Sequence, residues 1–283
     1  MRNGDVSAGD MTKTQDGTAR QEAPSQESQS QDSVDSFGWQ WSERAVYDSL
    51  TTIYHRLFTQ MNIWSDYLDG KVVADVGSGT GRHIWALSKL TKATELISVE
   101  LADQAVATQR KILTDPRLRI IHADAKLASF KADFIYMAGF IQHTEDPRAV
   151  LQRQVDNLND KGEIVVSFYM RTPATMALEP IRQITKRLPK TWLWNLSPLL
   201  VLPFFFRASQ IKAGFKNARH TAYDFFGSHA YQKYFTSSEI DALIAAVGIH
   251  PKNVLRISKG LYRLRKGAFA SNLDDTLITF GKA

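Results

Sequence analysis

Three glycines at alternate positions follow a short apolar run in the stretch VVADVGSGTGRH, residues 72–83. A glycine has no side chain, so Gly77, Gly79 and Gly81 allow the main chain to approach a ligand closely. A strand, a glycine-rich turn and a helix together form a ligand site at the carboxyl end of a parallel sheet. The sequence therefore predicts that the loop binds a ligand with main-chain atoms.

The spacing of the glycines separates three kinds of ligand. A phosphate-binding P-loop needs G-x-x-x-x-G-K-[ST], and no lysine follows Gly81. A dinucleotide fold needs G-x-G-x-x-G, whereas this chain has G-x-G-x-G. S-adenosylmethionine carries no phosphate, and such a loop can wrap around its methionine end. An NAD-dependent enzyme shares the glycines and is the alternative, although no segment resembling a nicotinamide half follows.

Acidic residues end the next two predicted strands. Glu100 ends ELISVE, residues 95–100, and Asp124 ends RLRIIHAD, residues 117–124. A carboxylate at Glu100 can accept hydrogen bonds from both hydroxyls of a ribose, which neutral side chains do poorly. Three elements that close successive strands are a far more specific signal than a glycine triplet alone.

These three elements resemble class I S-adenosylmethionine-dependent methyltransferases. VVADVGSGTGRH is similar to their first motif, V-L-D-x-G-x-G-x-G. The resemblance implies that Glu100 binds the ribose and that Asp124 faces the adenine amino group. It implies S-adenosylmethionine as the cofactor, and the cofactor site is expected to contain Asp75, Gly77, Gly79, Gly81, Glu100, Asp124 and Ala138.

Three further stretches resemble one bacterial group within that class. They are FGWQW at 37–41, GFIQHTEDP at 139–147 and RHTAYDFFGSHAYQKYFTSSEI at 219–240. The group has F-G-Y-Q-W, a His-rich L-H-H-T-x-D-P and a lid rich in Tyr and Phe. Gln142 replaces the first histidine of the usual pair, which leaves His143 for any role of that pair. The group acts on diverse acceptors, so the resemblance implies methyl transfer without implying a substrate.

The acceptor side of the site depends on His143, which follows the fourth predicted strand. A nearly neutral pKa suits a general base for a hydroxyl or ammonium acceptor. The alternative is that His143 only hydrogen-bonds a loop carbonyl. The candidate substrate-binding residues, each of which also has a purely structural interpretation, are Trp39, Trp41, Gln142, Tyr223, His229 and Tyr231.

Two missing features narrow the chemistry. Methyltransferases that act on the amino groups of nucleobases usually carry [DNS]-P-P-[FY] after the fourth strand, and this chain has AGFIQHT there. Metal-dependent catechol-type enzymes need carboxylates at that point, which Ala138 and Gly139 do not supply. The sequence therefore predicts an enzyme that needs no metal.

Strands and helices alternate from residue 71 onward. Apolar runs predict strands, and helical spacing predicts the segments between them. The expected fold is α/β, a Rossmann-like, doubly wound and mostly parallel sheet with an antiparallel edge pair and a helical lid insertion. Expected strands are 71–77, 95–100, 117–124, 132–138, 162–170, 253–258 and 275–281, the last two antiparallel; expected helices are 82–91, 102–113, 146–158 and 236–247.

Four segments follow from this pattern. Residues 1–36 are polar without apolar periodicity, and we expect them to be a disordered tail. Residues 37–170 form the expected cofactor-binding core, 171–235 a helical and aromatic lid insertion, and 236–283 the completion of the core sheet. The start of the chain has neither a secretory nor a transit pattern, so the expected location is the cytoplasm.

Positive charge is concentrated in the second half of the chain. Residues 180–270 contain fifteen Arg and Lys against three Asp and Glu, which predicts an anionic partner. The apolar, Trp-containing stretch 191–207 lies among the cations of 182–219 and is too short to span a bilayer, which needs about 20 apolar residues. It is either a hydrophobic lid or a segment that rests peripherally on an anionic membrane.

We expect a methyltransferase whose acceptor is a small molecule or an amphipathic molecule that bears a lipid or a sugar. The methylated atom is an oxygen, a nitrogen or a carbon. One alternative is a nucleic-acid methyltransferase that uses the basic half to bind phosphates. The other is a non-catalytic, cofactor-binding subunit. The sequence does not determine the oligomeric state.

Overall fold

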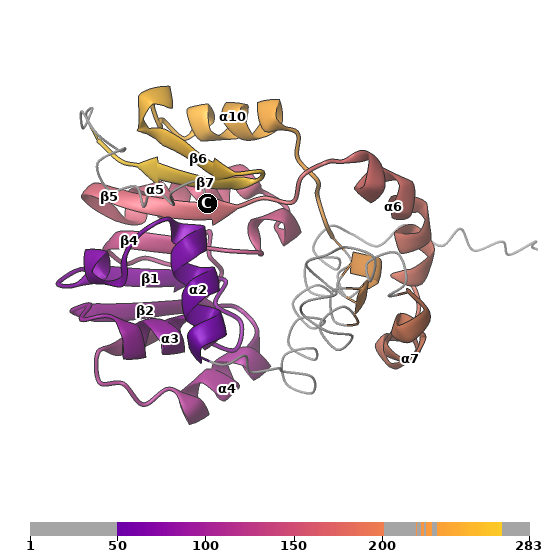
Figure 1. Ribbon diagram of the computed structural model, residues 1–283, viewed down its shortest axis with the longest axis horizontal. Helices are drawn as coiled ribbons and strands as arrows, with labels where there is room; N and C mark the ends of the chain where they lie inside the picture. Colours follow the sequence, from indigo (N-terminus) through magenta and orange to yellow (C-terminus); the bar gives the residue numbers. More distant parts are fainter. Residues whose placement is uncertain (1–49, 201–218, 220–221, 224, 228–230, 268–283) are drawn as a thin grey trace, which may run out of the picture.

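The computed structural model describes residues 50–200, 219, 222–223, 225–227 and 231–267. A seven-stranded sheet has the order β3-β2-β1-β4-β5-β7-β6 (Figure 1). Its strands are β1 (Val72–Val76), β2 (Glu95–Glu100), β3 (Leu118–His122), β4 (Ala132–Met137), β5 (Leu158–Ser167), β6 (Val254–Ser258) and β7 (Leu261–Arg265). The helices are α2 (Leu50–Met61), α3 (Arg82–Leu90), α4 (Asp103–Ile112), α5 (Pro147–Asn157), α6 (Pro173–Thr185), α7 (Lys190–Leu200), α10 (Ser237–Ala246) and the short η1 (Ser65–Leu68), η2 (Ile141–His143) and η3 (Pro251–Asn253).

Parallel pairing joins the first five strands, which confirms the predicted α/β class. Side chains alternate between the two faces of a strand. Val73 of β1 therefore packs with helices α2 and α3 on one face, and Ala74 and Val76 pack with α5 and α10 on the other. Helices cover both faces, as expected for a parallel sheet. β5 is shifted from its predicted position, because it begins at Leu158 and ends at Ser167.

The antiparallel edge is a hairpin of β6 and β7. β7 pairs with β5 on its other side, so the predicted edge is antiparallel as expected. The sequence did not predict β7, which is the described partner of β6; residues 275–281 lie outside the described residues, so their pairing with 253–258 stays a prediction. The β6–β7 hairpin turns at Lys259 and Gly260, where Gly260 has φ +81° and allows a two-residue connection.

Capping residues begin two of the predicted helices. The Asp146 side chain accepts a hydrogen bond from the Ala149 N–H, and Pro147 occupies the first turn of α5. Thr236 and Glu239 form a reciprocal capping box at the start of α10. Both confirm helix starts expected from the sequence.

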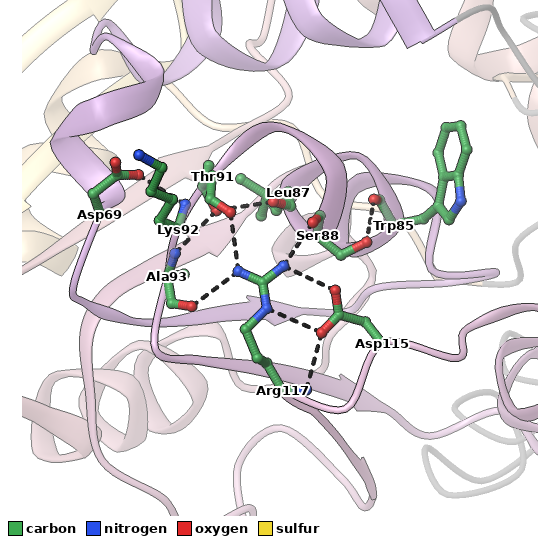
Figure 2. Close-up of polar contacts among 9 residues, drawn as sticks. All are labelled: Asp69, Trp85, Leu87, Ser88, Thr91, Lys92, Ala93, Asp115 and Arg117. Atoms are coloured by element: carbon green, nitrogen blue, oxygen red, sulfur yellow. Dashed lines mark hydrogen bonds and ion pairs between the residues drawn. The ribbon is translucent and has the colours of Figure 1, made fainter.

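Arg117 ties the end of α3 to the start of β3 (Figure 2). Its guanidinium donates to the carbonyl oxygens of Ser88, Thr91 and Ala93 at 2.6–3.0 Å and pairs with Asp115 at 2.8 Å. The last carbonyls of a helix lack partners within it, and Arg117 supplies donors for this end of α3. The glycine loop precedes the opposite end of α3, so these contacts help to hold the helix that carries the loop.

Residues 173–200 form the described helices α6 and α7 of the predicted insertion, which lie to one side of the sheet (Figure 1). Their inner faces pack with Ala222, Tyr223 and Phe226 in a separate apolar cluster. The insertion leaves and rejoins the core at one point, where Met170 and Phe235 form a parallel bridge. Helix α7 ends at Leu200, and residues 201–207 of the predicted apolar stretch lie outside the described residues. Within the described chain, no helix has the length and apolar character required to cross a bilayer.

Candidate cofactor and acceptor site

A cavity opens at the carboxyl ends of β1, β2 and β4. The strand order reverses between β1 and β4, which is where doubly wound sheets bind ligands. The cavity brings together six of the residues singled out from the sequence, which come from four separate segments of the chain: Gly77, Gly79, Glu100, Asp124, Ala138 and His143.

The glycine loop adopts a backbone that favours glycine. Gly77, Gly79 and Gly81 have φ values of +72°, +57° and +81°. A Cβ atom at Gly77 would lie 2.8 Å from Cβ of Phe140, which itself lines the cavity. The alternating glycines therefore satisfy two requirements at once, the left-handed conformation and close packing against the loop that follows β4.

Glu100 is held by three main-chain donors. Its Oε2 accepts from the Gly79 N–H at 2.7 Å, and its Oε1 accepts from the Leu101 and Ala102 N–H groups at 2.9 and 2.8 Å. A carboxylate has about four acceptor positions, so acceptor capacity is left over. The carboxylate is thus oriented toward the loop while it faces the cavity.

A buried polar network, which sequence reasoning missed, supports the loop from behind. Gln109 of α4 donates to the Gly79 carbonyl at 2.6 Å and to Ser78 Oγ at 2.8 Å. The Ser98 hydroxyl lies 2.6 Å from Ser78 Oγ and 2.7 Å from Gln109 Oε1. Gln109 lies on the buried face of α4 with apolar residues. A polar residue on an apolar helix face was the sequence signal that could have predicted this network.

Asp124 and Asp75 have different surroundings. Asp124 lines the cavity, where its Oδ1 accepts from the Lys126 N–H and its Oδ2 lies 3.4 Å from Lys126 Nζ. Asp75 is buried in β1 between β2 and β4, behind the cavity lining. Its Oδ2 has no hydrogen-bond partner in the described structure. Burial, and to a smaller extent the charge of Glu100, raise the pKa of Asp75 to about 7 against the opposing effect of Arg82.

His143 lies at the acceptor side of the cavity. Its Nδ1 is 3.2 Å from the Tyr231 carbonyl oxygen, which only accepts, so Nδ1 carries the proton. In the neutral ring the lone pair is therefore on Nε2. Burial lowers the pKa of His143 to about 4, against a smaller raising effect of that hydrogen bond. The imidazole is neutral near pH 7.

The other candidate acceptor residues are dispersed. Tyr231 contributes its carbonyl to His143. Gln142 is fully buried next to His143, and neither polar atom of its amide has a partner within the described residues. Tyr223 packs against Trp194 inside the insertion cluster, away from the cavity, with ring centroids 5.4 Å apart. Trp39, Trp41 and His229 lie outside the described residues.

A row of aromatic rings, also missed by sequence reasoning, runs from His143 to the insertion. His143 meets Tyr169 edge to face at 5.5 Å, Tyr169 stacks with Tyr234 at 6.3 Å, and Tyr234 meets Phe225 at 6.3 Å. The backbone adds a second link, because the Lys233 N–H donates to the Gln142 carbonyl at 2.9 Å. The position of the insertion and that of His143 are therefore coupled. No cluster of three potential metal ligands occurs among the described residues.

Comparison with known proteins finds a family match for part of the chain. Residues 74–164 match the family model of the methyltransferase domain. This segment runs from β1 into β5 and contains the glycine loop, Glu100, Asp124 and His143. Residues 74–164 therefore match a methyltransferase domain, and this match includes the candidate cofactor residues.

Individual relatives share part of the chain. The ribosomal RNA small subunit methyltransferase G of Treponema pallidum is 32% identical over 80 residues, which are 26% of this chain and 36% of that protein. The chain thus spans about a third of the curated relatives that it matches.

Two solved structures are also similar. A complex of the Haloferax volcanii Trm112 methyltransferase activator with a methyltransferase has 13% identity and a TM-score of 0.47, over 78% of this chain and 77% of that one. Magnesium protoporphyrin IX methyltransferase of Synechocystis PCC 6803 has 12% identity and a TM-score of 0.47, over 77% and 82%.

Proposed function

We propose that this protein transfers a methyl group from S-adenosylmethionine to an oxygen, nitrogen or carbon atom of a small-molecule or amphipathic acceptor. The observation that carries the proposal is that the glycine loop, Glu100, Asp124 and His143 line the same cavity. It lies within the segment that matches the methyltransferase domain.

The chain's own residues fit the cofactor. The left-handed glycines leave the loop backbone without side chains where the methionine end would lie, and Glu100 retains acceptor capacity for ribose hydroxyls. Asp124 is available for the adenine amino group. When bound, S-adenosylmethionine supplies an electrophilic methyl group on a sulfonium sulfur, which leaves with the electron pair of the broken bond.

His143 is proposed as the base. An attacking hydroxyl becomes a strong acid as its bond to the methyl carbon forms, so a weak base that is neutral at pH 7 is sufficient to take the proton at Nε2. The Tyr231 carbonyl holds the imidazole in the required tautomer. The rest of the acceptor pocket would come from the insertion, which the aromatic row connects to His143.

One observation favours a second acceptor class, RNA. The partial relative from Treponema pallidum is named a ribosomal RNA methyltransferase, and residues 180–270 are strongly basic. Methylation of an exocyclic amine by the usual proline motif does not fit AGFIQHT, so an RNA acceptor would need another mode of attack. Transfer of label from S-adenosylmethionine to RNA, weakened steeply by salt, would identify this class. Cofactor binding without product from any extract would instead indicate a non-catalytic subunit.

Calorimetry tests the cofactor assignment. Loss of charge-assisted ribose bonds costs about 2–4 kcal/mol, so Glu100→Ala should weaken S-adenosylhomocysteine binding by roughly 30- to 1000-fold. Glu95→Ala, at the other end of the same strand in an exposed ion pair with Arg119, is the matched control and should bind normally. Binding of NADH but not S-adenosylhomocysteine would overturn the assignment. Mass spectrometry of the product from cell extracts identifies the acceptor.

A further inference from the structure

Helix α6 is amphipathic with its apolar side facing outward. The side chains of Met176, Ile181 and Ile184 are 48%, 43% and 70% exposed, and Ala177 and Pro180 are exposed beside them. The spacing of these positions places them on one side of the helix. A surface helix normally presents its apolar side to the core, so an outward apolar side requires a different partner.

The inner side of α6 combines Leu178, which packs on the apolar cluster of the insertion, with polar contacts. Arg182 is 3% exposed and forms a two-pronged ion pair with Glu179 at 2.8 and 2.9 Å. The Thr185 hydroxyl donates to the Phe226 carbonyl. A Cβ at Gly227 would lie 2.5 Å from Cα of Lys186, so this end of α6 is in close contact with the chain at 226–227. These contacts fix which side of α6 faces out.

Helix α7 also has an outward apolar side. Leu193, Trp194 and Ser197 face inward, and Arg219 lies over the Trp194 ring at 4.0 Å. The outer side carries large apolar side chains at helical spacing, of which Trp192 is 65% and Leu199 69% exposed. We use the name α6–α7 face for the exposed apolar side chains of both helices: Met176, Ile181, Ile184, Trp192, Leu196 and Leu199.

Positive charge accompanies this face. Arg187 is exposed and Lys186 half-buried in the short connection between the two helices. The only carboxylate of α6, Glu179, is paired with Arg182, and the sequence has no acidic residue between Arg182 and Arg219. An apolar surface with an exposed tryptophan and an excess of cations complements an anionic membrane interface, in which apolar side chains and indole rings insert below charged headgroups.

We propose that the α6–α7 face docks onto an anionic lipid membrane. The face belongs to the insertion that rejoins the core beside His143, so docking would hold the cavity near the membrane surface. The inference concerns an interaction surface and does not depend on the proposed methyl transfer.

Co-sedimentation of the full chain with vesicles tests the docking. Vesicles of phosphatidylcholine with 30% phosphatidylglycerol should pellet the protein, pure phosphatidylcholine should pellet much less, and 0.5 M salt should weaken the binding. Trp192→Ser combined with Ile184→Ser should reduce binding at least about 10-fold, because two large apolar side chains no longer insert. Trp64→Ser is the matched control, since Trp64 is 59% exposed on a different part of the chain and should bind as wild type.

Each outcome decides the proposal. Every substituted side chain is exposed, so the variants should fold as wild type does. Circular dichroism and S-adenosylhomocysteine binding check this. Absence of binding to all vesicles, or an equal loss in Trp64→Ser, overturns it. Sedimentation velocity tests the alternative that a second copy of this chain occupies the face. This alternative holds if the protein is a dimer, the Trp192 and Ile184 changes dissociate it, and vesicles do not bind it.

Discussion

Burial shifts the pKa values of Asp75 and His143 in opposite directions, and each shift favours the neutral form of the side chain. It raises the pKa of the Asp75 carboxyl to about 7 and lowers that of the His143 imidazole to about 4, because a charge is disfavoured away from water. The two residues flank the cavity, one behind the glycine loop and one at the acceptor side. The first shift can be tested through the pH dependence of stability and the second through the pH dependence of the rate.

Asp75 should make the stability of the protein fall as pH rises. Its folded pKa lies above the ordinary value of 3.8, so its stabilising contribution is complete at low pH and is lost as pH rises toward 7. Asp75→Asn removes this dependence, and its free energy of unfolding relative to wild type should rise by about 2–3 kcal/mol between pH 5 and pH 8. Urea unfolding at both pH values measures the difference.

Asp115→Asn is the control with the opposite sign. Hydrogen bonding to Arg117 lowers the pKa of Asp115, so its contribution is present above the ordinary pKa and lost as pH falls. The destabilisation in this variant should shrink toward pH 3. A pH-independent difference between Asp75→Asn and wild type would contradict the raised pKa.

His143→Ala should lower turnover about 10²- to 10⁴-fold, the usual contribution of a positioned base, with almost unchanged affinity for S-adenosylhomocysteine. Since the pKa is near 4, protonation of His143 should cause no loss of wild-type rate between pH 8 and pH 6. Single-turnover rates with the identified acceptor measure both effects, with the exposed His122 replaced by Ala as control. An unchanged rate would show that His143 is not the base and has only a structural role in the loop.

At the scale of the elements, the glycine loop is positioned by three neighbours in the fold. The Phe140 ring lies against Gly77, Glu100 binds the Gly79 N–H, and Gln109 binds the Gly79 carbonyl. These contacts come from the loop after β4, the end of β2 and the C-terminal half of α4. The loop conformation is thus a property of the assembled sheet edge.

Gly77→Ala separates backbone strain from crowding. A left-handed conformation costs a residue with a side chain about 1–2 kcal/mol, and contact with Phe140 adds to this at Gly77. Gly70→Ala is the matched control, because Gly70 has φ +74° and nothing within 4 Å of the added carbon. Thermal unfolding should show a larger loss for Gly77→Ala, and calorimetry a weaker cofactor affinity in that variant alone. Equal losses would mean that Phe140 moves aside freely.

For the whole molecule, a buried ionic cluster joins distant parts of the chain. Glu163 of β5 accepts from Arg263 and Arg265 of β7 at 2.5–2.8 Å and from the Tyr67 hydroxyl at 3.0 Å. Arg263 also donates to the Asn62 carbonyl. The cluster therefore connects the antiparallel edge, the last parallel strand β5 and the segment that precedes β1.

Glu163→Gln should destabilise the whole fold. Removal of one partner from a buried ion pair costs about 3–5 kcal/mol, because the remaining charge has no compensation. Asp241→Asn leaves only the exposed Arg256 unpaired and should cost less than about 1 kcal/mol. Chemical unfolding of both variants at pH 7 measures the contrast, and similar small losses would show that solvent reaches the cluster.

The sequence alone determined the features that depend on neighbouring residues: the alternation of strands and helices, the glycine loop, the acidic residue that ends β2 and the starts of α5 and α10. These follow from local conformational preference and from apolar periodicity, which a short window of sequence contains. Only the tertiary structure decided that β7 pairs with β5, that Gln109 supports the loop, that the Tyr231 carbonyl selects the tautomer of His143, and that α6 turns its apolar side outward. Each of these depends on contacts between residues far apart in the chain, and such contacts exist only once the chain has folded.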